Sequence, residues 1–246
     1  MKISVITVAY NSATTIAETL KSVAGQAHSD IEHLIIDGAS TDDTIAVVRS
    51  YGAHAAAVVS ESDEGIYDAM NKGLRLATGD FVGFLNADDT FADSDCVSRI
   101  ARAAEASSVD AVYGDLLYVR KDRPEEIVRH WRSGQFKRSK LRFGWMPPHP
   151  TLYVRRTRIA EIGPFDSNFR IAADYDFILR YLNRSGLGVA YIPHVLVRMQ
   201  TGGASNRSLG ALLQKSREDL RALRSNSVGG VFTLFCKNVR KLPQFL

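Results

Sequence analysis

Two adjacent carboxylates, Asp88 and Asp89, end the segment FVGFLNADD, which begins as an apolar run. Two like charges this close repel each other unless something positive joins them. Hard oxygen ligands of this kind suit Mg²⁺ or Mn²⁺ carrying a bound phosphate. The alternative is structural, because Asp89 or Asp93 could cap a helix that follows. A second acidic strand end at Asp37 favours the metal interpretation.

Asp37 follows the apolar run Leu34-Ile35-Ile36 and precedes Gly-Ala-Ser-Thr-Asp-Asp. A carboxylate at the end of a buried strand can accept hydrogen bonds from a nucleobase or a ribose. The alternative is a turn or cap role, which we assign instead to Ser40, Asp42 or Asp43.

Asp68 and Lys72 lie four residues apart in EGIYDAMNKG, so on a helix they share one face. Spacing alone leaves two interpretations open. The pair is either a surface ion pair, or Lys72 neutralises a diphosphate while Asp68 orients that lysine.

The elements that must position these residues alternate between strand and helix patterns. The predicted strands are residues 2–9, 32–37, 55–61 and 80–85. The first predicted helix opens with a capping box, Thr15-x-x-Glu18, and has Ile16, Leu20 and Val23 on one face; two more are predicted at 42–51 and 65–77. Residues 86–90 are expected as a loop. Such alternation predicts an α/β fold with a mainly parallel sheet, whose ligands bind beyond the carboxyl ends of the strands. The polar clusters at 10–11, 37–43 and 86–89 fall at such ends.

The second half is less regular. Residues 110–120 and 127–131 are expected as antiparallel strands, 135–150 as a long loop, 174–184 as a helix, 189–193 and 195–199 as two short strands, and 209–224 and 228–242 as helices. We expect one domain over residues 1–205 and a helical tail over 206–246. Gly202–Ser205 is either a mobile loop over the donor or a plain turn.

The composition excludes several classes of protein. Only two cysteines occur, far apart, which argues against a disulfide framework or a structural zinc site and favours a cytoplasmic location. No run of 18 uncharged apolar residues is present, so we expect no membrane span. Residues 120–158 are rich in arginine and lysine, which indicates either a solvated surface or a face for anionic lipid or a phosphorylated acceptor. We expect no nucleic-acid partner.

Together these segments resemble the inverting glycosyltransferases of family 2, which have the GT-A nucleotide-sugar fold. The resemblance covers about residues 3–200 and includes SVITVAYN, LIIDGASTDDT, GIYDAMNKG, FLNADD, HPTLYVRR and IAADYDFILR. It points to the subgroup that builds bacterial exopolysaccharide, lipopolysaccharide or glycolipid sugars. The resemblance implies a nucleotide-binding surface from Val8, Ala9 and Tyr10, a base contact from Asp37, and a cation near the diphosphate at Lys72.

The same resemblance assigns the metal and the catalytic base. Asn86-Ala87-Asp88-Asp89 matches the DxD-type motif, with Asp88 near ribose or metal and Asp89 as the more direct ligand of Mn²⁺ or Mg²⁺. Many members have Asp where this chain has Asn86, so three-carboxylate coordination is not expected. Asp174 matches the base of the ED-x-D motif, although Ala173 replaces the usual acid.

Two further site residues have structural alternatives. Asp176 either supports Asp174 or caps the helix, and without the resemblance both aspartates are explained by helix capping. His149 matches a histidine expected near acceptor or metal, but backbone contacts would explain it equally well.

The sequence therefore predicts a metal-assisted, inverting transfer of a sugar from a nucleotide-diphospho-sugar to a hydroxyl of a glycan or lipid-linked acceptor. The alternative is a non-catalytic nucleotide-sugar-binding scaffold of the same fold. A nucleotidyltransferase would need a glycine-rich loop after the first strand, and a dinucleotide oxidoreductase would need GxGxxG; both are absent.

The tail carries apolar residues at spacings of three and four, beside several cations. These are Val228, Val231, Phe232, Phe235, Val239 and Leu242, with Lys237, Arg240 and Lys241 alongside. Such a helix lies on an anionic membrane, at the inner face of the plasma membrane for a cytoplasmic enzyme, or packs on the protein body or on a second subunit. The sequence does not predict the oligomeric state.

Overall fold

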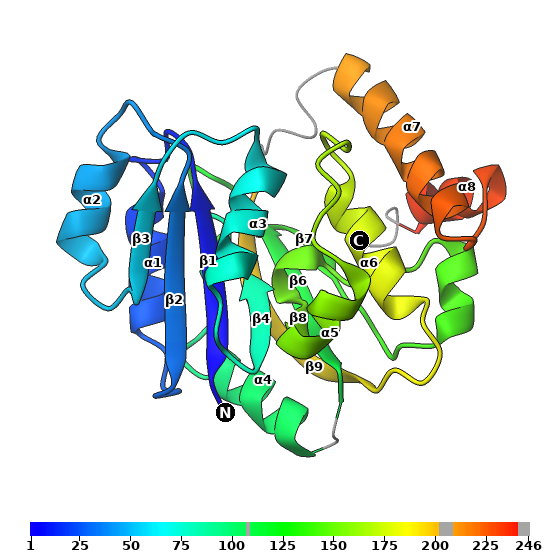
Figure 1. The fold of residues 1–246 in the computed structure, drawn as a ribbon, viewed down its shortest axis with the longest axis horizontal. Coiled ribbons are helices and arrows are strands. Elements are labelled where there is room, and N and C mark those ends of the chain that lie inside the picture. Colours follow the sequence, from blue (N-terminus) through cyan, green and yellow to red (C-terminus); the bar gives the residue numbers. More distant parts are fainter. Residues whose placement is uncertain (107–108, 202–208, 241–246) are drawn as a thin grey trace.

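The computed structural model describes residues 1–106, 109–201 and 209–240 (Figure 1). Its elements in chain order are β1 (Ile3–Ala9), α1 (Ile16–Ala24), β2 (Ile31–Asp37), α2 (Thr44–Tyr51), β3 (Ala57–Ser60), α3 (Ile66–Leu76), β4 (Phe81–Phe84), β5 (Asp89–Phe91), α4 (Cys96–Ala106), β6 (Ala111–Val119), β7 (Ile127–Trp131), η1 (Arg138–Phe143), η2 (His149–Thr151), β8 (Tyr153–Arg155), α5 (Arg156–Ile162), α6 (Ala173–Leu182), β9 (Val189–Gln200), α7 (Leu209–Ser225) and α8 (Val231–Val239).

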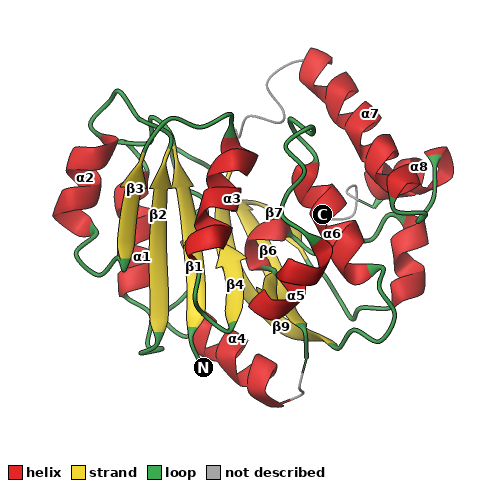
Figure 2. Ribbon diagram, in the orientation of Figure 1, coloured by secondary structure: helices red, strands yellow, loops and turns green. Residues whose placement is uncertain are grey.

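One mixed sheet holds the molecule together, with strand order β3-β2-β1-β4-β8-β6-β9-β5 and β7 paired to β6. The four strands from the first half are parallel, as the βαβ pattern predicts. Figure 2 shows helices against this sheet and the two last helices, α7 and α8, at one edge of the molecule. The predicted α/β fold is confirmed.

The core lies on both faces of the sheet because β1 is buried along its whole length. Side chains alternate along a strand. Ile3 and Val5 therefore pack in the cluster that includes α4 residues, while Ile6 and Val8 pack in the cluster that includes α3 and α6 residues. Packing on both faces holds β1 in place, and with it the carboxyl end of the strand, where the candidate site begins at Tyr10.

The first predicted helix is confirmed as α1, but its predicted capping box is wrong. Thr15 makes no side-chain cap bond, because its hydroxyl donates to the backbone oxygen of Ser12. The Glu18 carboxylate instead accepts a hydrogen bond from Lys21.

Three predictions for irregular segments are corrected. Residues 89–91 form β5, which pairs antiparallel with β9, rather than a loop. The two short strands predicted at 189–193 and 195–199 are one strand, β9, whose register against β6 shifts between Tyr113 and Asp115. The long loop at 135–150 contains the 3₁₀ helix η1 and the start of η2.

Two tail helices are confirmed as α7 and α8, and α7 packs on α6. The predicted boundary at residues 205 and 206 and the Gly202–Ser205 loop fall outside the described residues, as do Lys241 and Leu242. Within the described ranges, no helix has both the length and the apolar character that crossing a membrane requires.

Candidate functional site

Three strand ends meet at one edge of the sheet and bring Tyr10, Gly38 and Asp63 together. A Cβ atom on Gly38 would clash with the Asp63 carboxylate and would lie 3.4 Å from the Tyr10 ring. A residue with a Cβ at position 38 would therefore require the Asp63 carboxylate to move. Tyr10 is 64% exposed at this edge, so its ring offers a free face to a ligand.

The predicted base-binding Asp37 lies behind this surface. Its carboxylate is fully buried and accepts hydrogen bonds from the Ser40 backbone nitrogen, the Ser40 hydroxyl and the Ser60 hydroxyl. Val8 and Ala9 are also buried beneath the edge. In this conformation Asp37 therefore joins the ends of β2 and β3, and Tyr10 and Asp63 are the accessible groups.

Lys72 and Asp68 lie on α3 and face the loop that follows β3. The Lys72 ammonium is 3.0 Å from Glu61 and 3.7 Å from Asp68, and it donates to the Ser62 backbone oxygen at 2.6 Å. Burial lowers the pKa of Lys72, but the carboxylates of Glu61, Asp68 and Asp63 outweigh it and raise the pKa, which keeps the ammonium charged. A diphosphate bound here would therefore face the charged Lys72 ammonium, which also pairs with the Glu61 and Asp68 carboxylates.

Asn86, Asp88 and Asp89 follow the next strand, β4. The Asp89 side chain is fully buried and accepts from the Asn86 side-chain nitrogen at 3.1 Å. Burial raises the pKa of Asp88, and burial together with the Asp88 charge raises the pKa of Asp89 well above its usual range. Asp88 is partly exposed, so the two carboxylates differ in access.

This pair fits a divalent cation. Buried oxygens of Asn86 and Asp89, Oδ1 in each, lack a hydrogen-bond partner, and the raised pKa values report negative charge without compensation. Among the described residues no three His, Cys, Asp or Glu side chains form a complete metal site. The remaining ligands would have to come from a bound diphosphate. Access favours Asp88 over Asp89 as the direct ligand.

Asp174 lies at the start of α6, and it does not cap that helix. The residue before the helix, Ala172, carries the cap position, and no side-chain cap bond forms there. The Tyr67 hydroxyl lies 3.3 Å from Asp174 Oδ1 and donates to the Ile171 backbone oxygen at 2.6 Å. The Asp174 carboxylate is partly exposed and available to a ligand.

Asp174 shares a neighbour with the metal-binding pair. Burial raises the pKa of Tyr118, Arg129 opposes that rise, and the charges of Asp89 and Asp174 add to it. The two carboxylates, 85 positions apart in the sequence, therefore act on one phenol from different elements. Asp89 and Asp174, two of the acidic groups that the sequence singled out, therefore both act on the pKa of Tyr118.

The matched family model describes "Glycosyl transferase family 2" and covers residues 4–161. The chain belongs to glycosyl transferase family 2. It is 32% identical over 209 residues to a PGL/p-HBAD biosynthesis glycosyltransferase of Mycobacterium tuberculosis, an alignment that covers 82% of this chain and 78% of the relative.

Solved structures show that this family 2 chain has the GT-A fold. Staphylococcus aureus TarS 1-349 in complex with UDP-GlcNAc matches with a TM-score of 0.70 at 20% identity, over 93% of this chain and 66% of TarS 1-349. The mannosyltransferase PcManGT from Pyrobaculum calidifontis, in complex with GDP-Man and Mn²⁺, matches with a TM-score of 0.69 at 21% identity, over 99% of this chain and 72% of that one. The chain is thus a glycosyltransferase by family and fold.

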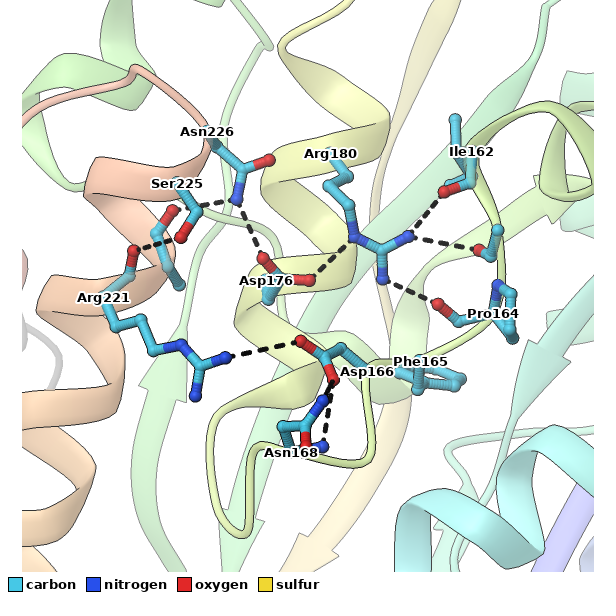
Figure 3. Close-up of polar contacts among 12 residues, drawn as sticks. Ile162, Pro164, Phe165, Asp166, Asn168, Asp176, Arg180, Arg221, Ser225 and Asn226 are labelled. Atoms are coloured by element: carbon cyan, nitrogen blue, oxygen red, sulfur yellow. Dashed lines mark hydrogen bonds and ion pairs between the residues drawn. The ribbon is translucent and has the colours of Figure 1, made fainter.

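Asp176 of this family 2 chain is a structural residue. Its buried carboxylate accepts hydrogen bonds from Arg180 at 2.7 Å and from Asn226 at 2.9 Å (Figure 3). Arg180 in turn donates to the backbone oxygens of Ile162 and Pro164. This network joins α6 to α7 and to the end of α5, so Asp176 supports the helix without capping it.

His149 packs in an aromatic cluster beside the site. Its ring stacks on Phe84 with centroids 5.3 Å apart and meets the edge of Phe165 at 5.8 Å. Burial lowers the pKa of His149, while the Asp174 charge opposes that change. A neutral imidazole near Asp174 is consistent with a place close to the acceptor.

Several residues that hold the site were missed from the sequence. Asn71 on α3 exchanges two hydrogen bonds with the Phe165 backbone, both 2.9 Å long. Glu218 on α7 accepts from three successive backbone nitrogens, those of residues 170, 171 and 172, at 3.2, 2.8 and 3.0 Å. Both partners are backbone groups distant in sequence, so no sequence pattern could reveal them. Asp63, which directly precedes the segment EGIYDAMNKG, was also missed.

One cavity lies away from this chemistry. It has a volume of about 470 Å³ and is lined by Arg138, Arg158, Glu161 and Arg184 among others, and none of the site residues above lines it. We place the site at the strand ends, because the accessible aromatic ring, the uncompensated carboxylates and the family motifs coincide there.

Proposed function

We propose that this family 2 glycosyltransferase moves a hexose from a nucleotide-diphospho-sugar to a hydroxyl of a glycan or lipid-linked acceptor, with inversion at the anomeric carbon. One observation carries the proposal. The charges of Asp174 and of Asp89, one member of the Asp88–Asp89 pair, both raise the pKa of Tyr118, which supports a base and a cation-binding group that serve one reacting sugar.

The strand-end surface is the proposed donor site. Tyr10 would stack on the nucleobase, with Val8 and Ala9 beneath it. Asp63 is the accessible carboxylate for the base or ribose, and the buried Asp37 would hold the loop that shapes this contact. Lys72 and Asp68 would take the diphosphate side, with Lys72 supplying positive charge.

A divalent cation, Mn²⁺ or Mg²⁺, would be held by Asp88 with Asn86 and Asp89 behind it. When bound, such an ion neutralises charge that develops on the diphosphate leaving group. The uncompensated oxygens of Asn86 and Asp89 support this assignment. The Mn²⁺ and GDP-Man of PcManGT, a structure of the same fold, support it by analogy.

Asp174 is the proposed general base. Its carboxylate would accept the proton of the acceptor hydroxyl while that oxygen bonds to the anomeric carbon and the bond to the diphosphate breaks. A positioned base of this kind contributes about 10²–10⁴-fold to the rate. With one base and no carboxylate assigned as nucleophile, a single displacement inverts the configuration.

The acceptor class rests on the resemblance to enzymes that build exopolysaccharide, lipopolysaccharide or glycolipid sugars. A cytoplasmic location with peripheral contact at the inner face of the plasma membrane stays a prediction. A lipid-linked acceptor would make such contact useful.

The deciding experiment compares Asp174→Asn with the wild type and with Asp166→Asn, a control on the preceding loop. Donor binding is measured first, as thermal stabilisation by UDP-, GDP- and dTDP-sugars with and without Mn²⁺. Transfer is then measured with the donor that binds.

We expect Asp174→Asn to bind the donor like the wild type while transfer falls by at least about a hundredfold. Unchanged transfer in Asp174→Asn would remove the base assignment. Donor binding without transfer in the wild type, across a panel of glycan and lipid-linked acceptors, would favour the alternative of a non-catalytic binding scaffold.

A further inference from the structure

Helix α8 exposes most of its large apolar side chains to solvent and packs on the protein through two buried polar side chains and the partly buried Leu234. Val231, Phe232 and Phe235 are each 65% exposed, whereas Thr233 and Lys237 are buried. A helix that only completes a core has the opposite arrangement. The apolar side of α8 is therefore left for a partner.

The polar side of α8 is held in a fixed position. The Thr233 hydroxyl donates to the Arg142 backbone oxygen at 2.9 Å, and Lys237 forms an ion pair with Asp219 at 2.7 Å. A Cβ on Gly144 would clash with the Lys237 backbone, so η1 and α8 lie in close contact. The exposed phenylalanines thus sit on a helix whose orientation is set by the fold.

A second element extends the exposed apolar surface. Phe143, at the end of η1, is 51% exposed, and its ring meets that of Phe232 at a centroid distance of 6.3 Å. Val239, at the last position of α8, is also exposed. We call Phe143, Val231, Phe232, Phe235 and Val239 the apolar patch. Helix α8, which carries four of these residues, lies at the outer edge of the molecule in Figure 1.

Positive charge surrounds the apolar patch. Lys137, Arg138 and Arg142, on and beside η1, are exposed. The sequence contains no aspartate or glutamate from residue 127 to 160, and none after Asp219. Asp219 itself is buried in its ion pair with Lys237. The two segments that build the patch therefore carry cations without opposing carboxylates of their own.

We propose that the apolar patch docks this protein on an anionic lipid surface. Exposed aromatic side chains flanked by arginine and lysine match an interface where acyl chains lie beneath negative headgroups. A second copy of the chain fits less well. A two-fold contact would place each patch against its own copy, and the η1 cations would then face one another.

Docking would also place the proposed reaction near the bilayer. The Lys237 ammonium lies 3.3 Å from the centroid of the Tyr175 ring on α6, and Tyr175 follows the proposed base Asp174. A bilayer on the outer side of α8 would therefore lie next to the helix that carries Asp174. This consequence, unlike the docking itself, rests on the transfer function proposed above.

The test measures cosedimentation of the full chain with vesicles, without donor or acceptor, so its failure is separate from a failure of sugar transfer. The vesicles are phosphatidylcholine alone or equal parts phosphatidylcholine and phosphatidylglycerol. The variants are Phe232→Ser with Phe235→Ser, and Lys137→Gln with Arg142→Gln. Tyr51→Ser is the matched control, because Tyr51 is 48% exposed on α2, at the opposite end of the molecule in Figure 1.

We expect the wild type and Tyr51→Ser to bind the anionic vesicles. The phenylalanine variant should bind at least about tenfold more weakly, and the charge variant about tenfold more weakly. Melting curves that match the wild type would show that both variants fold. Absence of vesicle binding by the wild type, or unchanged binding by the phenylalanine variant, would overturn the proposal. So would a wild-type dimer, seen by light scattering, that Phe232→Ser with Phe235→Ser dissociates while vesicles remain unbound.

Discussion

Lys237 on α8 and Asp219 on α7 form an ion pair of 2.7 Å in which the side chains are only 6% and 4% exposed. Burial lowers the pKa of Lys237, and the Asp219 charge opposes that change. The same ammonium lies over the Tyr175 ring of α6. One buried cation therefore joins both tail helices to the helix that carries the proposed base.

Removing one partner of this pair should destabilise the protein strongly. Lys237→Met leaves the Asp219 carboxylate buried and uncompensated, which costs about 3–5 kcal/mol of unfolding free energy. Urea denaturation measures the loss. Combining it with Asp219→Leu should recover most of the stability, because both buried charges are then gone. Arg99→Met, which breaks an exposed pair with Asp93, is the control and should cost less than about 1 kcal/mol. Equal losses in the two single variants would contradict a special role for the buried pair.

Glu218 should act on catalysis by positioning Asp174. Its carboxylate accepts the backbone N–H groups of residues 170–172, directly before the helix that bears the base. Glu218→Gln weakens these charge-assisted bonds and lets the loop shift. Because a displacement of about 1 Å can cost about 10²-fold in rate, we expect kcat to fall by roughly 10–100-fold.

The donor KM should separate positioning from general damage in that variant. The strand-end surface does not touch Glu218, so donor KM should stay within about twofold of the wild type. Glu161→Gln, which alters an exposed carboxylate paired with Arg158, is the control and should leave both constants unchanged. A rise in donor KM with kcat preserved would show that Glu218 has no positioning role.

The Asp88–Asp89 pair should make the metal-free wild type less stable than a variant in which one of the two carboxylates is neutral. Burial and mutual repulsion disfavour these charges, as their raised pKa values report. Asp88→Asn and Asp89→Asn should each raise the unfolding free energy of the metal-free protein by about 1 kcal/mol, since active-site charges are kept at a cost in stability.

The same two substitutions, Asp88→Asn and Asp89→Asn, should weaken metal binding. Both variants should lose the Mn²⁺-dependent part of the thermal stabilisation by a nucleotide-sugar, and Asp88→Asn should lose more of it. Asp95→Asn, an exposed carboxylate just before α4, is the control. A metal-free protein that becomes less stable yet keeps the full Mn²⁺ effect would exclude the pair as a cation site.

The parallel strands β1 to β4 could be predicted because the sequence pattern of each strand and helix lies within that element itself. Each of β1, β2 and β4 is rich in apolar residues, and the intervening helices carry their own periodicity. The short strand β5 was not, because Asp89–Phe91 becomes a strand only by pairing with β9, more than 100 residues later. Pro193 suggested a break between two strands, yet β9 continues through it, where the ladder to β6 shifts register.

The candidate site divides in the same way. Asp88 and Asp89 stand out from the sequence as acidic groups at a strand end, whereas Asp174 was found through the resemblance to the ED-x-D motif. The buried Asp37 carboxylate, by contrast, accepts hydrogen bonds from the Ser40 and Ser60 hydroxyls. Ser60 belongs to another strand, so this contact depends on the tertiary structure and cannot be predicted from the local sequence. The sequence also showed the apolar stripe of α8. Which side of this helix faces solvent, however, depends on the ion pair of Lys237 with Asp219 on α7.

Glu32 should make stability depend on pH in the acid range. Burial alone raises the pKa of Glu32, but hydrogen bonds from Lys2, Ser4 and Thr78 outweigh it and lower the pKa to about 2 from its ordinary value of 4.5. The unfolded chain therefore binds this proton more readily than the folded protein does. The stabilisation is fully present above pH 4.5 and is lost as the pH falls towards 2.

Glu32→Gln tests this sign directly. At pH 7 the variant should lose about 2 kcal/mol of unfolding free energy, because the ionised carboxylate is gone. At pH 3.5 the difference from the wild type should be smaller, since part of the stabilisation by the ionised carboxylate is already lost once the pH is below 4.5. Urea denaturation at pH 7, 5 and 3.5 measures the difference. A gap that stays constant over this range would mean that packing of the Glu32 side chain, rather than its charge, stabilises the junction of β1, β2 and the start of β4.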